Sequence, residues 1–237
     1  MQIGIIFRKP LIAMLAAVLC LMACPESANA QHKRKNNEVV RAYPSIGATL
    51  SQIRGDELRG FKKAGVTVGF GTLFSLDDKD RWHMSIEACF SQRGSKNRTI
   101  TPYALYGLTL NYVDIPVSFH FTDPYGGMTF GIGVCYSRLV QQPHGLIQNI
   151  PTDLVPDTTD FTFLKNDLAI ALDFRFPLWK NLMVNVRYQH SIIPIKRNFR
   201  FTQYHSSNEG DFDTWENDCY NSSLMFRLIY VFGSSKR

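Results

Sequence analysis

Apolar and polar residues alternate along much of the chain, most regularly in the stretch 112–121. The odd-numbered positions from 113 to 121 hold only Val, Ile and Phe, and Tyr, Asp, Pro, Ser and His occupy the even-numbered positions. A period of two is typical of a β-strand with one apolar and one polar face. Ten such residues suit a tilted strand that crosses a bilayer.

Seven further segments alternate in the same way, and together the eight predict a closed barrel. The predicted strands are 43–53, 65–76, 81–92, 108–121, 128–139, 164–176, 182–192 and 220–232. Their connections are short turns at 77–80, 123–127 and 177–181, and long loops at 54–64, 93–107, 140–163 and 193–219. Short turns on one side and long loops on the other are typical of outer-membrane barrels. We therefore expect an all-β protein, an eight-stranded antiparallel up-and-down transmembrane β-barrel, with its termini and short turns in the periplasm.

Side-chain size predicts which face of the barrel is inside. One face carries bulky residues such as Val68, Phe70 and Ile132, and the other carries small ones such as Gly69 and Gly133. The interior of an eight-stranded barrel is only just wide enough for side chains. The bulky face should therefore contact lipid. A soluble periplasmic ligand-binding barrel, with its apolar face inward, is the alternative.

Aromatic residues gather next to the predicted short turns and the C-terminal end of the last strand. Such residues form girdles at the membrane interface of outer-membrane barrels. We predict a periplasmic aromatic girdle of Phe74, Trp82, Phe119, Phe121, Phe130, Phe174, Phe176, Trp179, Tyr230 and Phe232.

Charged residues also fall on the small-residue face. An arginine facing lipid at the midplane costs about 2–4 kcal/mol, so these side chains should point inward and pair with one another. The predicted interior charge network consists of Glu87, Asp114, Asp173, Arg175, Arg187 and Arg227. Such a network predicts a plugged, non-conducting barrel, and a proton or ion path through it is the alternative.

The N-terminal region has the features of a secretory signal peptide. Arg8 and Lys9 precede an apolar run at 11–23, and the sequence Ala-Asn-Ala ending at Ala30 predicts cleavage there. Lipidation at Cys24 is the alternative.

These features predict four parts of the chain. They are a signal peptide (1–30), a short periplasmic arm (31–42), the outer-membrane barrel (43–232) and a C-terminal tail (233–237).

Composition adds little to this interpretation. The net charge of +6 comes without a basic helix or a clustered basic face, so we expect no nucleic-acid partner. The mature chain would keep Cys89, Cys135 and Cys219, whose number and spacing do not suggest a disulfide framework. Pro116 lacks the N–H that a central strand needs, which predicts a local bulge or a bridging water.

In the stretches 85–94, 110–117, 130–134, 185–188 and 228–232, the chain resembles the PorT-like outer-membrane β-barrel proteins of Gram-negative bacteria. The resemblance covers roughly residues 45–232 and is most specific in the sequence Tyr-Val-Asp-Ile-Pro at 112–116. It implies an integral eight-stranded outer-membrane barrel with a proline at this strand position. PorT is linked to protein secretion, a role that the resemblance alone does not transfer.

The chain offers little catalytic chemistry, and we expect neither an enzyme nor a cofactor. His83 and His120 should lie side by side and inward, where Glu87 and Asp114 could complete a metal site, although hydrogen-bonded interior histidines are the simpler interpretation. His144 and His205 lack a nucleophile at fixed spacing. A membrane-embedded barrel enzyme that uses loop residues is therefore a minor alternative.

We expect outer-membrane lipid and lipopolysaccharide as partners of the barrel. The long loops could contact protein partners in the cell envelope. The last loop is acidic and could bind divalent cations beside lipopolysaccharide, although a solvated loop is the simpler interpretation. Its acidic residues are Glu209, Asp211, Asp213, Glu216 and Asp218.

Overall fold

A computed structural model describes residues 40–55, 60–96, 105–141, 146–148, 154–156, 162–204 and 212–232. The chain divides into two units, 1–37 and 38–237, and the first lies outside the described residues. The predicted signal peptide, Cys24, the tail at 233–237, His144 and His205 also lie outside them. Among the described residues, no helix is long and apolar enough to span a bilayer.

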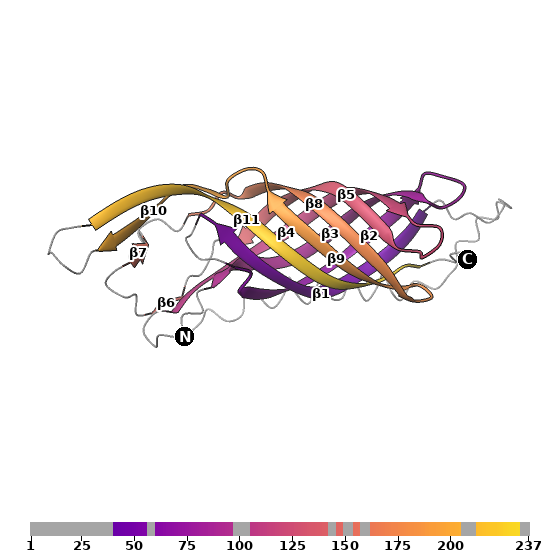
Figure 1. Cartoon of the computed structure of the whole chain (residues 1–237), viewed down its shortest axis with the longest axis horizontal. Helices are drawn as coiled ribbons and strands as arrows, with labels where there is room; N and C mark the ends of the chain where they lie inside the picture. The colour runs from indigo at the N-terminus through magenta and orange to yellow at the C-terminus, as the bar shows by residue number, and fades with distance from the viewer. Residues whose placement is uncertain are drawn as a thin grey trace, which may run out of the picture. The chain divides into compact units, whose positions relative to one another are not determined.

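Eight strands form the barrel wall, and three shorter ones lie beyond it (Figure 1). The wall strands are β1 (Val40–Arg54), β2 (Lys63–Ser75), β3 (Trp82–Lys96), β4 (Leu105–Thr122), β5 (Thr129–Gln141), β8 (Asn166–Trp179), β9 (Leu182–Ser191) and β11 (Phe212–Tyr230). The other strands are β6 (Leu146–Gln148), β7 (Leu154–Pro156) and β10 (Lys196–Tyr204).

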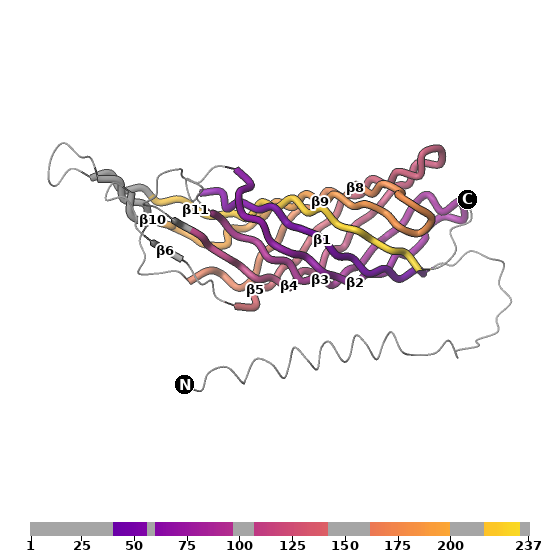
Figure 2. The backbone as a smooth tube through the Cα atoms, turned by 90° about the horizontal axis from the view of Figure 1, so that it is seen from below, coloured from indigo at the N-terminus to yellow at the C-terminus, as the bar shows by residue number. Residues whose placement is uncertain are grey.

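The wall closes on itself because the first strand pairs with the last. Neighbouring strands pair antiparallel in the order β1-β2-β3-β4-β5-β8-β9-β11, and β11 returns to β1 from Ser45↔Ile229 to Arg54↔Tyr220. Figure 2 shows the strands winding obliquely around the barrel. The predicted eight-stranded antiparallel barrel is thus confirmed.

Short turns and long connections lie at opposite ends of the barrel, at the right and left of Figure 1, respectively. The short turns join β2 to β3, β4 to β5 and β8 to β9. Both described ends of the chain lie with them, since the Phe232 N–H donates to the Ala42 carbonyl at 2.8 Å. We call these the short-turn end and the long-loop end.

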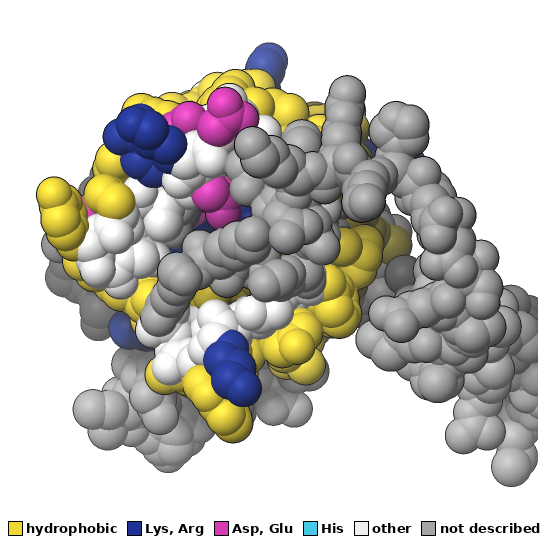
Figure 3. Space-filling view, turned by 90° about the vertical axis from the view of Figure 1, so that its right-hand side faces the viewer, with side chains coloured by type: hydrophobic (Ala, Val, Ile, Leu, Met, Phe, Trp, Pro, Cys, Tyr) yellow, Lys and Arg dark blue, Asp and Glu magenta, His cyan; other side chains and the backbone are white. Residues whose placement is uncertain are grey.

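Bulky side chains cover the outside of the wall and small ones face the interior. Ile46 is 64% exposed and Ile132 is 60% exposed, whereas Cys89, Cys135 and Ala171 are buried. Figure 3, which views the short-turn end, shows hydrophobic side chains around the outside and charged side chains in the mouth. This distribution contradicts the soluble alternative, in which the apolar face would point inward.

The strands are longer than the alternation predicts. β1 begins at Val40, inside the predicted arm, and β3 continues to Lys96 while β4 begins at Leu105. The predicted loop at 93–107 therefore contributes to both strands. Gly94 has a φ of 145° and pairs with Thr109, so the glycine carries β3 past a backbone conformation that other residues rarely adopt.

The predicted loops at 140–163 and 193–219 contain β6, β7 and β10. β11 pairs with β1 and β9 only from Tyr220 onward, and its earlier residues pair with β10, which in turn pairs with β7. We call β7, β10 and the Phe212–Cys219 part of β11 the outer sheet; it extends away from the barrel in Figure 1. β6 pairs with the beginning of β4.

Pro116 lies in β4 without a bulge, which was one of the two predicted accommodations. The β3–β4 ladder passes from Ile86↔Val117 to Cys89↔Asp114 in unchanged register, skipping the proline and its neighbour. Pro116 pairs with Cys135 on the β5 side. The residue is tolerated because its missing N–H falls in the skipped part of the β3 ladder.

Gly47 at the seam between β1 and β11 provides a test of close backbone packing. A Cβ at this position would overlap the carbonyl oxygen of Phe226 and crowd the Cα of Arg227. We expect Gly47→Ala to lower the free energy of unfolding by about 1–3 kcal/mol, because the seam must move to admit a methyl group. Urea unfolding in lipid vesicles would measure the change. Gly107→Ala is the matched control, since no atom lies within 4 Å of a Cβ there; equal urea midpoints for the two variants would contradict the expectation.

Candidate functional site

Buried charges occupy the barrel interior in two layers. The lower charge layer, nearer the short-turn end, contains Glu87, Asp173, Arg175, Arg187 and Arg227. The upper charge layer, toward the long-loop end, contains Arg93, Asp114 and Asp167. All eight side chains come from wall strands and are almost completely buried.

In the lower charge layer, two arginines share the acids. Arg187 contacts Glu87 at 3.1 Å and Asp173 at 2.5 Å, and Arg227 lies 2.6 Å from Glu87. The Asn185 amide oxygen accepts from Arg227 Nε at 2.8 Å, and its nitrogen donates to Asp173. Because a guanidinium presents five donors in a planar fork, each arginine can bond more than one partner.

The upper charge layer is centred on Arg93. Its Nη2 lies 2.5 Å from Asp114 and donates to the Gln189 amide oxygen at 2.8 Å, while Nη1 lies 3.8 Å from Asp167. Ser91 donates to Asp114 at 2.7 Å, and the Arg93 guanidinium stacks 5.1 Å from the Tyr112 ring centroid. A buried arginine with two acids and further hydrogen bonds is well compensated.

Arg93 and Asp167 were missing from the predicted network. We placed Arg93 in a loop, whereas it lies in β3 two residues beyond the inward-facing Ser91. Asp167 lies two residues before the inward-facing Ala169 in β8. The parity of each strand could have identified both residues.

The eight formal charges sum to zero. The lower charge layer holds three arginines and two acids, and the upper charge layer holds one arginine and two acids. The lower charge layer therefore has one excess positive charge, and the upper charge layer has one excess negative charge. Because the two layers lie inside one narrow barrel, this arrangement avoids a net buried charge, which would be expensive.

An apolar cluster lies beyond the upper charge layer. It joins the long-loop ends of wall strands to residues before β8 and residues before and within β10. Lys196 Nζ lies 5.6 Å from the Phe163 ring centroid and 5.4 Å from that of Phe199. We call it the outer apolar cluster; it consists of Ile53, Leu108, Leu110, Tyr112, Leu139, Phe163, Ile195, Phe199 and Cys219. Our sequence analysis did not predict it.

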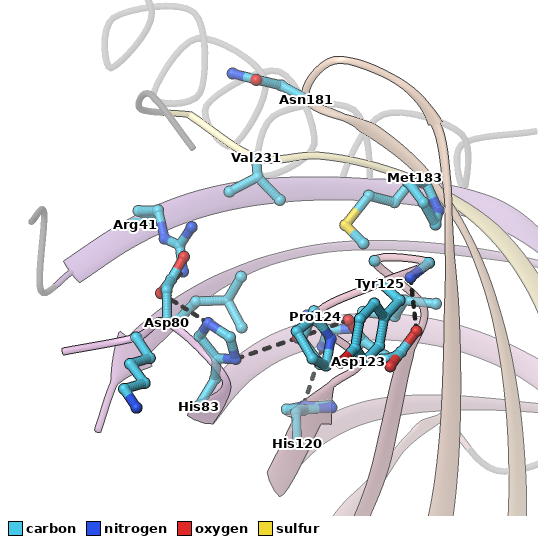
Figure 4. A pocket seen from close by; sticks show the side chains of 18 of the residues that line it. Arg41, Asp80, His83, His120, Asp123, Pro124, Tyr125, Asn181, Met183 and Val231 are labelled. Carbon is cyan, nitrogen blue, oxygen red and sulfur yellow. Dashed lines mark hydrogen bonds and ion pairs between the residues drawn. The ribbon is translucent and has the colours of Figure 1, made fainter. Parts of the chain in front are cut away.

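The short-turn end is hollowed by a cavity of about 460 Å³, which we call the vestibule. On its wall, Asp80 lies 2.7 Å from Arg41 and 2.9 Å from His83 Nε2, and the three side chains point toward one another in Figure 4. The hydrogen bond with His83, together with those from Ser75 and the charge of Arg41, lowers the pKa of Asp80 well below its usual range. Asp80 therefore stays ionised at neutral pH.

The two histidines considered for a metal site form hydrogen bonds with other residues. His83 and His120 are cross-strand neighbours, but His83 bonds Asp80 and His120 Nε2 lies 2.8 Å from Ser85 Oγ. Glu87 and Asp114 instead bind arginines. No group of three or more His, Cys, Asp or Glu within the described ranges is arranged to hold a metal ion.

Thr122, His83 and Asp80 form a line that superficially resembles a hydrolase triad. However, Thr122 Oγ1 lies 3.5 Å from His83 Nδ1 and bonds Thr129 Oγ1 at 2.9 Å. A separation of 3.5 Å exceeds that of a normal hydrogen bond, so the geometry favours a structural role for His83.

The predicted girdle residues lie on strand ends or turns at the short-turn end. Cross-strand ring pairs join Trp82 to Phe121 at 4.9 Å and Phe130 to Phe174 at 5.6 Å between centroids. Tyr230 and Phe232 contact each other at 5.3 Å, and Trp179 is exposed beside Lys180. Phe74, Phe119 and Phe176 lie on β2, β4 and β8.

The acidic residues of the predicted last loop are divided by the described ranges. Glu209 and Asp211 lie outside them, and Asp213 lies in β11 without a described side chain. Asp218 accepts the Asn198 N–H at 3.1 Å, and Glu216 is an exposed residue opposite Arg200. The three cysteines Cys89, Cys135 and Cys219 are buried and form no disulfide with one another.

Comparison with known families identifies the fold. Residues 15–227, most of the chain, match the family described as "Outer membrane protein beta-barrel domain". The chain belongs to this family. The family assignment agrees with the closed barrel and its apolar outer surface, and it makes the protein an outer-membrane β-barrel protein. A search of curated proteins found no match.

The solved structures that match this chain share little sequence with it. The attachment invasion locus protein Ail of Yersinia pestis is 13% identical, with a TM-score of 0.41, covering 81% of this chain and 99% of Ail. Neisserial surface protein A is 9% identical, with a TM-score of 0.41, covering 80% of this chain and 96% of its own. The outer membrane protease OmpT of Escherichia coli is 11% identical, with a TM-score of 0.27, covering 84% of this chain and 99% of OmpT.

Arg187 provides a test of the lower charge layer. We expect Arg187→Met to lower the free energy of unfolding by about 3–5 kcal/mol, because Asp173 and Glu87 would each lose a buried partner. Urea unfolding in vesicles, followed by the gel mobility of unboiled samples, would measure it. Arg138→Met is the matched control, since Arg138 is exposed on the outer surface and its loss should change stability by no more than about 0.5 kcal/mol. Similar unfolding midpoints for both variants would show that the layer contributes little.

Proposed function

We propose that the protein is a plugged, non-conducting outer-membrane barrel that presents an extracellular sheet to partners in the cell envelope. The observation that carries this proposal is the filling of the interior by two charge layers and the outer apolar cluster. The short-turn end faces the periplasm in this proposal, and the outer sheet faces the exterior.

The plugged interior rests on the size and bonding of its side chains. Arg93, Arg187 and Arg227 are among the largest fully buried residues, and each lies within 2.6 Å of a carboxylate. An eight-stranded barrel leaves room for little beyond its side chains. An ion crossing the barrel would have to break these pairs and pass the outer apolar cluster.

The interaction role rests on the outer sheet. β11 is a single strand of 19 residues whose first part leaves the wall and pairs with β10. A wall strand needs no such extension to cross the membrane, since the membrane-spanning part of a tilted strand is about 9–11 residues long. Among the described strands, β7 and the Phe212–Cys219 part of β11 each pair only with β10. Each therefore has an edge to which a strand of another protein could pair.

We further propose that the protein is not an enzyme and belongs to the PorT-like branch of its family. The separation of 3.5 Å between Thr122 Oγ1 and His83 Nδ1 supports the first point. The sequence at 112–116, with Pro116 inside β4, supports the second. Participation in protein secretion is not part of the proposal.

The proposed arrangement in the envelope includes cleavage after Ala30, outer-membrane lipid around the apolar outer surface, and lipopolysaccharide beside the outer sheet. The aromatic residues at the short-turn end would form the periplasmic girdle. Their exposure supports this role, since Trp82, Phe119, Phe130 and Trp179 are all exposed in a protein whose aromatic residues would otherwise be expected inside.

Planar-bilayer recording tests the plug. The purified barrel, inserted at low protein density, should give no stepwise current across the voltage range in which a porin control conducts, because paired charges and apolar side chains fill its interior. Mobility on a gel before and after boiling should show that the inserted protein is folded. Reproducible single-channel steps from the folded protein would refute the plugged interior.

Shortening the outer sheet tests the interaction role. Replacing residues 201–215 by Asn-Gly would join Arg200 to its partner Glu216 through a two-residue turn, while retaining the outer apolar cluster and the wall. We expect intact cells treated with a crosslinker to lose the adducts that the unmodified protein forms, with folding unchanged. Tyr125→Ser, in a short turn at the opposite end, is the control and should keep the adducts. Adducts that persist in the shortened variant, or no adducts with the unmodified protein, would contradict this role.

A further inference from the structure

Arg175 differs from the other buried arginines of the interior. It is 2% exposed, yet it forms no ion pair with a carboxylate in the described part of the chain. Its Nη2 donates to His120 Nε2 at 3.2 Å, and its guanidinium stacks 5.2 Å from the Tyr43 ring centroid. Its Nε–H has no hydrogen-bond partner within the described ranges. Arg175 thus carries the excess positive charge of the lower charge layer.

A buried guanidinium normally has an anionic partner, because desolvation of a charge is expensive. The neighbouring acids do not provide one. Asp173 is engaged at 2.5 Å by Arg187, and Glu87 is engaged by Arg187 and Arg227. Arg175 lines the vestibule, whereas Arg93, Arg187 and Arg227 are not among its lining residues, so Arg175 is the arginine of the charge layers that a small molecule can reach from the short-turn end.

The vestibule is electrostatically suited to an anion. Its lining includes Arg41, Lys79, Arg175 and Lys180, against the acids Asp80 and Asp123. Asp80 is already engaged by Arg41 and His83, and Asp123 accepts the Gly126 N–H at 2.6 Å. Figure 4 shows these acidic side chains bonded to protein groups around the cavity. Two positive charges remain in excess, and the Nε–H groups of both Arg41 and Arg175 lack protein acceptors among the described residues.

We propose that the vestibule binds a small oxyanion, with Arg175 as the principal ligand and Arg41 as a second. The ligand is a carboxylate or phosphate group, because both place two acceptor oxygens at the spacing of a guanidinium fork. The cavity of about 460 Å³ accommodates a small molecule that carries such a group. In the proposed orientation this molecule comes from the periplasm.

His120 provides a direct reporter of this binding. His120 Nε2 lies 3.2 Å from Arg175 Nη2 and 2.8 Å from Ser85 Oγ. A guanidinium can only donate, so the contact with Arg175 requires Nε2 to act as the acceptor. An oxyanion that engages Arg175 would compete with His120 for the Nη2 donor. Binding should therefore shift the His120 Nε2 resonance, whereas an anion that binds only to surface lysines should not.

Calorimetry and NMR on the folded, full-length mature barrel test the proposal. The protein would be placed in a non-ionic maltoside detergent without phosphate, and titrated separately with inorganic phosphate and with acetate. We expect saturable binding of at least one anion, with a shift of the His120 signal in selectively 15N-histidine-labelled protein. The stronger of the two titrations would identify the preferred oxyanion.

Substitutions assign the binding to Arg175. Arg175→Met should weaken binding by about tenfold or more, Arg175→Lys should weaken it less because it keeps the charge without the fork, and Arg41→Gln should have an intermediate effect. Arg138→Met, an exposed arginine at the long-loop end of β5, is the matched control and should bind as the unmodified protein does. Gel mobility before and after boiling would verify that each variant is folded.

Two results would overturn the proposal: no saturable binding of either anion up to about 10 mM, or equal binding by the unmodified and Arg175→Met proteins. If Arg175→Met does not fold, unchanged binding in both Arg175→Lys and Arg41→Gln would have the same meaning. The outcome is independent of the bilayer and crosslinking experiments, because anion binding requires neither a closed pore nor an extracellular partner.

Discussion

The narrow interior of an eight-stranded barrel governs which side chains this protein can place inside it. Closure between β1 and β11 leaves no free edge in the wall, but it also removes interior polar groups from both lipid and bulk water. Glycines such as Gly69 and Gly133 leave room for the side chains of neighbouring strands, which a Cβ there would contact. In the space that remains, arginine is well suited, because one guanidinium can join acids from two different strands, as Arg187 joins Glu87 and Asp173.

The two ends of this interior are chemically different. At the long-loop end, the outer apolar cluster covers the upper charge layer, in which Arg93 is held between Asp114 and Asp167. At the short-turn end, the vestibule gives solvent access toward the lower charge layer, and Arg175 lies at this boundary. Among the described residues, apolar side chains therefore line the interior at one end and the vestibule opens it at the other. The proposed small ligand and the proposed large partner would thus meet the protein at opposite ends.

Alternation along the chain was enough to predict the wall, the direction of its two faces and six of the eight charges in the two charge layers. The parts it missed depend on contacts between distant segments. Arg93 was not predicted to lie in a strand, because Gly94, Ser95 and Lys96 end the apolar alternation. Pairing with β4 nevertheless continues there. β10 and the early part of β11 do not cross lipid, so they lack the regular apolar face that identifies a wall strand. The vestibule is lined by residues of several strands and turns, so no local sequence motif predicts it. The bulge expected at Pro116 did not occur because a skipped stretch of the β3 ladder accommodates the missing N–H.

β11 belongs to two structures at once, since its first residues form part of the outer sheet and its later residues close the wall against β1. This continuity has a mechanical consequence. A pull on the outer sheet along β11 would load the β1–β11 seam in shear, so that the hydrogen bonds from Ser45↔Ile229 to Arg54↔Tyr220 resist together rather than one after another. A force on the outer sheet would therefore be resisted by many hydrogen bonds of the barrel wall at the same time.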